Sequence, residues 1–165
     1  MAIVSLSKLS KLRRRFEKTV LAGGVFDILH PGHIAHLIKA KSLGKTLIVH
    51  ITGDKRVREK KGVGRPITPE KYRALIISSL RFVDFVFIYN GKHYDQKIID
   101  TLRPDILFFN KKAFTPEVKL LVNNLKNFSG KIFVDKQEKI FSASKIIKRL
   151  KKLKLPKVLG SEPFL

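Results

Sequence analysis

The chain has 165 residues, 44% of them hydrophobic, and its 35 Lys and Arg against 13 Asp and Glu give a formal net charge of +22 at pH 7. This size and apolar content suit one folded domain, and no apolar run approaches the ~20 residues that a membrane-spanning helix needs. The absence of cysteine excludes disulfides, thiolate metal sites and a cysteine nucleophile. Because the first residues also lack the long apolar stretch of a secretory signal, we expect a cytoplasmic protein.

Apolar runs alternate with stretches of helical periodicity along the chain. Strands are predicted at 19–26, 46–51, 83–89, 105–109 and 130–134. Helices are predicted from 31, at about 70–80, at 94–102, at 116–128 and from 142. The stretch 52–69, rich in Gly, Pro and charge, is predicted to be a loop.

This alternation in short units predicts an α/β protein. We expect a single Rossmann-like domain with a mostly parallel five-stranded sheet and helices on both faces. The domain is expected to span 12–150, with a basic N-terminal extension at 1–11 and a basic C-terminal tail at 151–165.

The net charge of +22 has two interpretations. Clustered Lys and Arg gain affinity for nucleic acids by releasing phosphate counterions, whereas dispersed ones make a cationic, solvated surface. Basic residues occur at both ends and throughout the interior of the chain, so their distribution favours the surface interpretation. Nonspecific nucleic-acid binding stays open.

The turn after the first predicted strand has the sequence GGVFDILHPGH over 23–33. In parallel α/β sheets, ligands bind beyond the carboxyl ends of the strands. Gly23 and Gly24 at such an end allow a backbone to approach a phosphate closely, and Gly32 leaves space where the next helix opens. The pattern therefore indicates a phosphate site at this turn.

His30 and His33 lie three residues apart at the start of that helix. They would present two imidazole donors to one anion, where the helix dipole already favours negative charge. An isolated H-x-x-H motif is also typical of a buried structural pair or of a zinc site. The neighbouring glycines and Asp27 favour the phosphate interpretation.

The run GGVFDILHPGH resembles the signature of the H-x-G-H nucleotidyltransferases, the cytidylyltransferase-like superfamily. These enzymes move a nucleoside monophosphate from a triphosphate to a phosphorylated acceptor and release pyrophosphate. The segments KKGVGRPITPEKYRALIISSLRFVDFVF and LRPDILFF are similar in order and spacing to heptose-1-phosphate adenylyltransferases, and more loosely to glycerol-3-phosphate cytidylyltransferases. FSASKIIKRL resembles the closing I-S-T-T-x-I-I motif of the family, so the resemblance covers 12–150.

The resemblance implies roles for individual residues. The implied nucleotide-binding residues are Gly23, Gly24, Val25, Phe26, Asp27, Gly32, Arg73, Ser142 and Ser144. The implied catalytic residues are His30, His33 and Lys61, and the implied acceptor-binding residues are Asp27 and Asp54. Lys61 would close over the triphosphate, and Arg73 would bind phosphate. As isolated residues, Lys61 and Arg73 also fit an ordinary basic surface, and Asp54 and Ser142 also fit simple caps.

The chain departs from the family pattern at several places, among them two that affect the expected substrates. Asn110-Lys111-Lys112 stand where the family usually has a glycine-rich stretch with an acid, and Ala143 stands where a hydroxyl is usual. These departures leave open both the base of the nucleotide and the identity of the acceptor.

The resemblance implies ATP or CTP with Mg²⁺ as co-substrate, and a sugar phosphate or polyol phosphate as acceptor. FAD synthesis from flavin mononucleotide and a noncatalytic nucleotide-binding or RNA-binding role are the alternatives. Chains that resemble this one often form homodimers. The apolar stretch 81–89 fits either a two-fold interface or an interior parallel strand.

Overall fold

Six strands form one parallel sheet in the computed structural model of the chain, which describes residues 2–92, 94–136 and 143–152. The strands are β1 (Ala2–Ile3), β2 (Thr19–Gly24), β3 (Thr46–Thr52), β4 (Phe85–Tyr89), β5 (Ile106–Asn110) and β6 (Lys131–Asp135). The helices are α1 (Leu6–Leu12), α2 (Pro31–Lys41), α3 (Asp54–Lys61), α4 (Glu70–Ser78), α5 (Gln96–Leu102), α6 (Pro116–Asn123) and α7 (Ala143–Lys152), with a 3₁₀ turn η1 (Arg13–Arg15) after α1. The predicted α/β architecture is confirmed.

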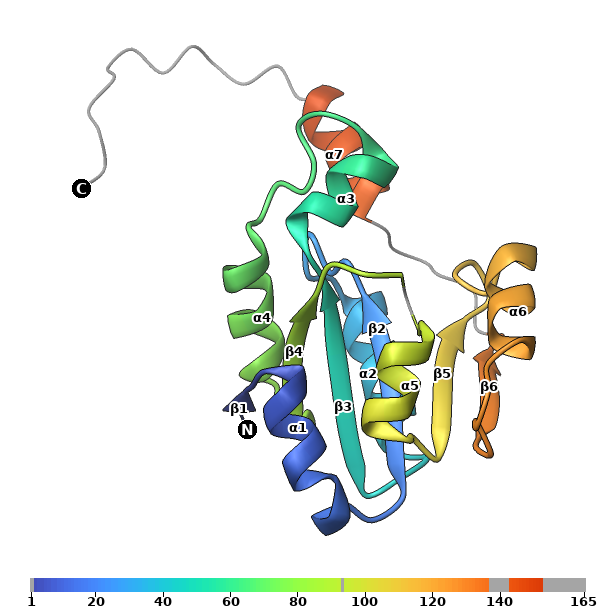
Figure 1. Cartoon of the computed structure of the whole chain (residues 1–165). Helices are drawn as coiled ribbons and strands as arrows, with labels where there is room; N and C mark the ends of the chain where they lie inside the picture. Colours follow the sequence, from blue (N-terminus) through green and yellow to red (C-terminus); the bar gives the residue numbers. More distant parts are fainter. Residues whose placement is uncertain (1, 93, 137–142, 153–165) are drawn as a thin grey trace.

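Apolar residues alternate between the two faces of the central strands and build a core on each face. In β2, Val20 and Ala22 join the core under α2 and α4, whereas Leu21 joins the core under α1 and α5. Helices therefore cover both faces of the sheet (Figure 1). Burial on both faces explains why the central strands are almost continuously apolar in sequence.

The strand order is β1-β4-β3-β2-β5-β6. β3 and β4 are added on one side of β2, and β5 and β6 on the other, so the order of the strands switches between β2 and β5. The two neighbours of β2 pair with it over different lengths. Pairing with β3 runs to Gly24 and Ile51, whereas pairing with β5 stops at Ala22 and Phe108. The strands β2 and β5 thus part just before the first turn, which is where a parallel α/β sheet places its ligand.

The first residues of the chain belong to the folded core. Ala2 pairs with Phe85, so β1 adds a sixth strand beside β4 to the five that the sequence predicted. Ser5 caps α1 by accepting a hydrogen bond from the Lys8 amide, and Leu9 is completely buried against α5. The sequence predicts an extension at 1–11, because a two-residue strand is too short to show any periodicity.

The apolar stretch 81–89 forms an interior strand. β4 lies between β1 and β3, and its Val86 and Phe87 are completely buried. Phe82 packs partly buried against the core on the α4 side. Of the two interpretations offered for this stretch, the structure supports the interior one.

Two predicted elements differ from those observed. The predicted loop at 52–69 contains α3, which was missed because Val57 is its one buried residue and its remaining side chains are polar. Gly53 caps this helix at its start, and Gly62 ends it with a left-handed φ of 82°. The helix predicted at 116–128 ends at Asn123.

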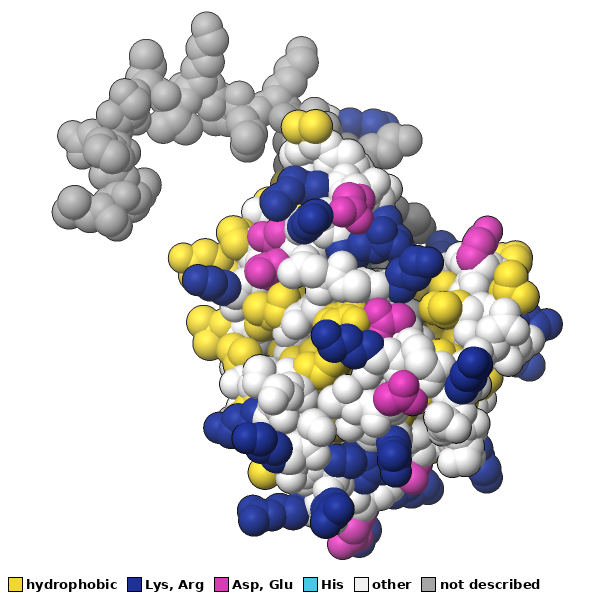
Figure 2. Space-filling view, viewed as in Figure 1, with side chains coloured by type: hydrophobic (Ala, Val, Ile, Leu, Met, Phe, Trp, Pro, Cys, Tyr) yellow, Lys and Arg dark blue, Asp and Glu magenta, His cyan; other side chains and the backbone are white. Residues whose placement is uncertain are grey.

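Lys and Arg side chains are spread over the whole visible face of the molecule rather than gathered in one stripe (Figure 2). This distribution agrees with a generally cationic surface. Within the ranges that the structure describes, no helix has the length and apolar character needed to cross a membrane.

Candidate active site

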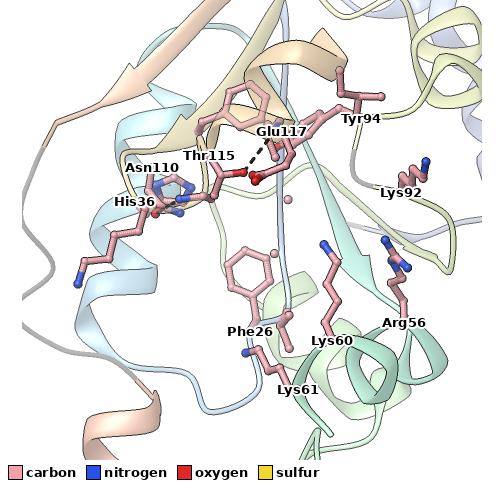
Figure 3. Close-up of a pocket in the computed structure, with 18 of the residues that line it drawn as sticks. Phe26, His36, Arg56, Lys60, Lys61, Lys92, Tyr94, Asn110, Thr115 and Glu117 are labelled. Carbon is pink, nitrogen blue, oxygen red and sulfur yellow. Dashed lines mark hydrogen bonds between the residues drawn. The ribbon is translucent and has the colours of Figure 1, made fainter.

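A pocket of about 830 Å³ opens beyond the carboxyl ends of β2 and β5 (Figure 3). It is lined by residues of the first turn, α2, α3, the loop after β4, the end of β5, and α6. These are Gly23, Gly24, Val25, Phe26, Asp27, His33, His36, Arg56, Lys60, Lys61, Lys92, Tyr94, Phe109, Asn110, Lys112, Ala113, Thr115, Glu117, Val118, Leu120, Leu121 and Asn124. The first-turn residues, His33 and Lys61 in this set are predicted site residues, and Asn110 and Lys112 are departures from the family pattern.

Glycine is required at position 23 by a close contact. The imidazole of His50, on the neighbouring strand β3, occupies the space where a side chain at Gly23 would lie. Phe26 then takes a left-handed φ of 50° and turns its ring edge toward His33, at 5.1 Å between ring centroids. Residues 23–26 thereby line one side of the pocket.

His30 and His33 are brought together at the start of α2. His30 is the N-cap residue, Pro31 and Gly32 follow in the first turn, and the two imidazole rings stack with centroids 3.7 Å apart. His30 is buried, at 5% exposure, while His33 lines the pocket. In the described part of the chain, no group of three or more His, Asp or Glu could hold a metal ion.

The carboxylate of Asp27 is buried and holds the segment that follows α3. It accepts hydrogen bonds from the amides of Ile67 and Thr68 at 2.7 and 3.0 Å, and pairs with the Arg65 guanidinium at 2.6 Å. Although Asp27 lines the pocket, its oxygens are engaged in anchoring this segment beside the first turn. Its predicted contact with the acceptor stays a prediction.

Arg73 lies beneath the first turn and does not line the pocket. Its guanidinium is completely buried and donates to the carbonyl oxygens of Val25, Thr52 and Thr68, with a 2.6 Å ion pair to Asp54. These bonds tie the first turn to the end of β3 and to the segment after α3. Both Arg73 and Asp54, predicted as ligand contacts, therefore lie in the support under the site.

Cations of α3 form one side of the pocket. Figure 3 shows Lys60 and Lys61 on this side, below the space that Asn110, Thr115 and Glu117 border from above. Desolvation, followed by the charge of Arg65, lowers the pKa of the Lys61 ammonium, and desolvation lowers that of Lys60 as well. A bound anion would raise both pKa values, because its negative charge stabilises the protonated ammonium.

The opposite wall is built from local turn and cap interactions. The side chain of Asn110 accepts a hydrogen bond from the Ala113 amide at 3.1 Å. Thr115 caps α6 by accepting from the Val118 amide, and Pro116 opens the helix, as the sequence predicted. A hydrogen bond from Thr115 holds the pKa of the exposed Glu117 carboxyl below its usual range.

Several pocket residues carried no recognised signal in the sequence. Arg56 and Lys60 lie on the missed helix α3, Lys92 lies after β4, and His36 and Tyr94 are buried. The doublet Lys60-Lys61 was the one clue to a cationic helix end. Ser142 lies outside the described residues, and for Ser144 the structure describes its place in α7 alone.

Comparison with known proteins gives a consistent family. The model of the cytidylyltransferase-like family matches residues 21–149. The bifunctional protein HldE of Campylobacter fetus is 40% identical over 128 residues, which cover 72% of this chain and 28% of that protein. HldE of Helicobacter pylori is 41% identical over 122 residues, or 70% of this chain and 26% of that protein. The chain thus spans less than a third of the length of these relatives.

Solved structures agree with this match. The lipopolysaccharide core biosynthesis protein of Thermoplasma volcanium has a TM-score of 0.64 and 32% identity, over 74% of this chain and 99% of that one. Pantoate-beta-alanine ligase of Francisella tularensis has a TM-score of 0.63 over 92% of this chain and 77% of that one, at 18% identity, and shows the fold alone.

Proposed function

Because the chain belongs to the cytidylyltransferase-like family of nucleotidyltransferases, we propose that it transfers AMP from ATP to a sugar phosphate and releases pyrophosphate. The observation that carries the proposal is one shared pocket. The first-turn glycines, His33 and the α3 lysines all line it, and His30 stacks on His33 at its edge. These are a glycine-rich turn, imidazole donors and cations, which together suit a triphosphate.

ATP is proposed rather than CTP because the sequence resembles heptose-1-phosphate adenylyltransferases more closely than glycerol-3-phosphate cytidylyltransferases. A sugar phosphate is proposed as acceptor on the same ground. The similarity to HldE proteins, at 40% and 41% identity, supports both choices.

In the proposed reaction, an oxygen of the acceptor phosphate attacks the α-phosphorus of ATP. The bond from that phosphorus to the oxygen bridging to the β-phosphate breaks, and pyrophosphate leaves with the bonding electrons. The attacking phosphate is already ionised, so no general base is needed. The protein has to align the two substrates and neutralise developing negative charge.

The residues divide this work between them. Backbone groups of Gly24 and Val25 would face the phosphates, and His30 and His33 would donate to the oxygens of the α-phosphate as charge develops. Lys61 would neutralise charge on the departing pyrophosphate. Asp27 and Arg73 would act by holding the first turn in place.

Mg²⁺ is part of the proposal as the companion of the triphosphate. This ion keeps most of its waters and binds through one or two protein oxygens together with substrate phosphates. Within the described ranges, no cluster of three or more acidic or histidine side chains could cage it. The triphosphate itself would be its main ligand, and its charge would assist departure of pyrophosphate.

Pyrophosphate release tests the proposal. We expect release with ATP and a sugar 1-phosphate, and much slower release with CTP or with glycerol 3-phosphate. Release with ATP and flavin mononucleotide alone would move the assignment to FAD synthesis. ATP binding without release of pyrophosphate with any acceptor would support the noncatalytic alternative.

The cytoplasm stays the predicted compartment.

We also propose a homodimer, with its interface on α4. The outer face of this helix exposes Tyr72, Leu75 and Ile76 at 61%, 58% and 40%, which is unusual for three apolar side chains one turn apart. A second copy of the same face would cover them. Sedimentation at micromolar concentration should give a dimer that Leu75→Glu converts into a folded monomer, and a monomeric wild-type protein would refute the pairing.

A further inference from the structure

Tyr94, from the segment before α5, contacts the point where β2 and β5 stop pairing, which we call the fork between these strands. The backbone ladder of these two strands ends at Ala22 and Phe108. At this point the hydroxyl of Tyr94 donates a hydrogen bond to the Phe108 carbonyl oxygen, at 3.0 Å. Burial raises the pKa of this hydroxyl, and the Gly23 backbone beside it partly offsets that rise. The hydroxyl therefore lies between the last paired residue of β5 and the first residue of β2 that β5 does not pair with.

Local structure fixes this tyrosine tightly. Tyr94 directly precedes Asp95, the N-cap of α5, and has a left-handed φ of 55°. The residue is 3% exposed, and its ring lies edge-to-face with His50 at 5.3 Å and tilted against Phe109 at 4.4 Å between ring centroids. A bulky residue rarely takes this backbone conformation, so the surrounding packing must stabilise it.

The same group of side chains lies directly under the glycine turn. His50, which contacts Tyr94, also fills the space beside Gly23. Tyr94 therefore reaches the turn in two ways, through its hydroxyl and through the imidazole ring that it contacts. Since glycine has the largest backbone freedom of any residue, this part of the turn depends on such contacts for a single conformation.

We propose that Tyr94 is a positioning residue, whose hydroxyl spans the fork between β2 and β5 and fixes the Gly23 and Gly24 backbone in the conformation that receives the triphosphate. Without the bridge, the two strands lose their last connection before the site, and the turn samples other conformations. Ordering it then costs part of the binding free energy of the triphosphate. This inference rests on the proposed function for the identity of the ligand.

The test compares Tyr94→Phe with Tyr89→Phe. Each substitution removes one tyrosine hydroxyl that donates a hydrogen bond, at 3.0 Å to Phe108 and at 2.7 Å to Asp95, but Tyr89 does not line the pocket. We expect Tyr94→Phe to weaken ATP binding and lower kcat/KM for ATP by about three- to tenfold, the range of one net hydrogen bond, with KM for the acceptor unchanged. Tyr89→Phe should leave both within about twofold.

Amide hydrogen exchange gives a readout that does not require turnover. Exchange at Gly23 and Gly24 should accelerate in Tyr94→Phe and stay at the wild-type rate in Tyr89→Phe. If exchange accelerates while wild-type protein releases no pyrophosphate with any acceptor, the positioning role stands and the proposed reaction fails. Equal losses of melting temperature in both variants, with unchanged exchange and ATP binding, would overturn the inference.

Should Tyr94→Phe fail to fold, the wild-type protein still decides the question. The chain has three tyrosines, so ¹⁹F spectra of protein labelled with 3-fluorotyrosine are readily assigned with Tyr72→Phe and Tyr89→Phe. Addition of ATP should shift the Tyr94 resonance and leave that of Tyr89 in place. An unmoved Tyr94 resonance in protein saturated with ATP would contradict the proposal.

Discussion

The two walls of the pocket are built in different ways. Beneath the first turn, Asp27 and Arg73 are buried charged residues that hydrogen-bond to backbone groups from several segments. On the other side, Lys112 and Glu117 are exposed, and the backbone is held by short-range bonds from Asn110 and Thr115. Buried, fully bonded charges specify one conformation more strongly than exposed ones. We call the side formed by the first turn and α3 the first wall, and the side formed by the end of β5 and by α6 the second wall. We infer that the first wall is the fixed part of the site and the second wall the adaptable part.

The strongest way to break the first wall is Arg73→Met. This change leaves Asp54 without its 2.6 Å partner and three carbonyl oxygens without a donor, and disruption of such a buried pair costs about 3–5 kcal/mol. Urea unfolding should report this loss in the free energy of unfolding. Lys71→Met, an exposed neighbour on α4, should change it by less than about 0.5 kcal/mol. Similar values for both variants would show that the support under the turn is dispensable.

Removal of either histidine should affect turnover rather than folding. We expect His30→Ala and His33→Ala each to lower kcat for pyrophosphate release by about 10²-fold or more, because a donor aimed at developing charge contributes about 2.7–4 kcal/mol. Lys39→Ala is the comparison, since Lys39 is exposed on the same helix and does not line the pocket. A loss of fold without a rate defect in the soluble fraction would favour the structural-pair interpretation.

Lys61 and Lys112 compare the two walls directly, since both are exposed lysines lining the pocket. Lys61→Ala should weaken ATP binding about tenfold, the scale of one charge-assisted hydrogen bond. Lys112→Ala should change it by less than about twofold. Titration calorimetry measures both, and the reverse order would place the triphosphate on the β5–α6 side.

The lowered pKa of Lys61 adds a pH dependence to this comparison. Because the ammonium loses its proton at a lower pH than an ordinary lysine, ATP affinity is fully present below that pKa and falls as the pH rises through it. Lys61→Arg keeps its charge over this range and should flatten the alkaline limb of the profile. If ATP affinity falls at alkaline pH in Lys61→Arg as it does in the wild-type protein, another group causes the fall.

Glu117→Gln should have the smallest effect on the triphosphate. The pKa of this exposed carboxyl is lowered, so the substitution removes a negative charge at neutral pH. We expect KM for ATP to stay within about twofold, while KM for an anionic acceptor falls slightly because repulsion is reduced. Steady-state kinetics with each substrate varied in turn would detect the split, and an effect confined to ATP would place the triphosphate, rather than the acceptor, beside Glu117.

The features that the sequence predicted correctly are local. The glycine turn and the helix opening at Pro31 follow from residues within 23–33, and the helix predicted from 116 begins at Pro116. Turn formation and capping depend on residues a few positions apart, so their pattern is visible in a single sequence. The same short range explains why the paired histidines could be placed in advance.

The support of the site depended on tertiary structure. Arg73 bonds to the carbonyl of Val25 across 48 residues of sequence, and Tyr94 bridges strands that enter the sheet from different parts of the chain. By itself, a basic residue in a chain of net charge +22 or a tyrosine before a helix has no distinctive pattern. Its role arises when folding buries it beside backbone groups that must be hydrogen-bonded, because only then does leaving them without partners become costly.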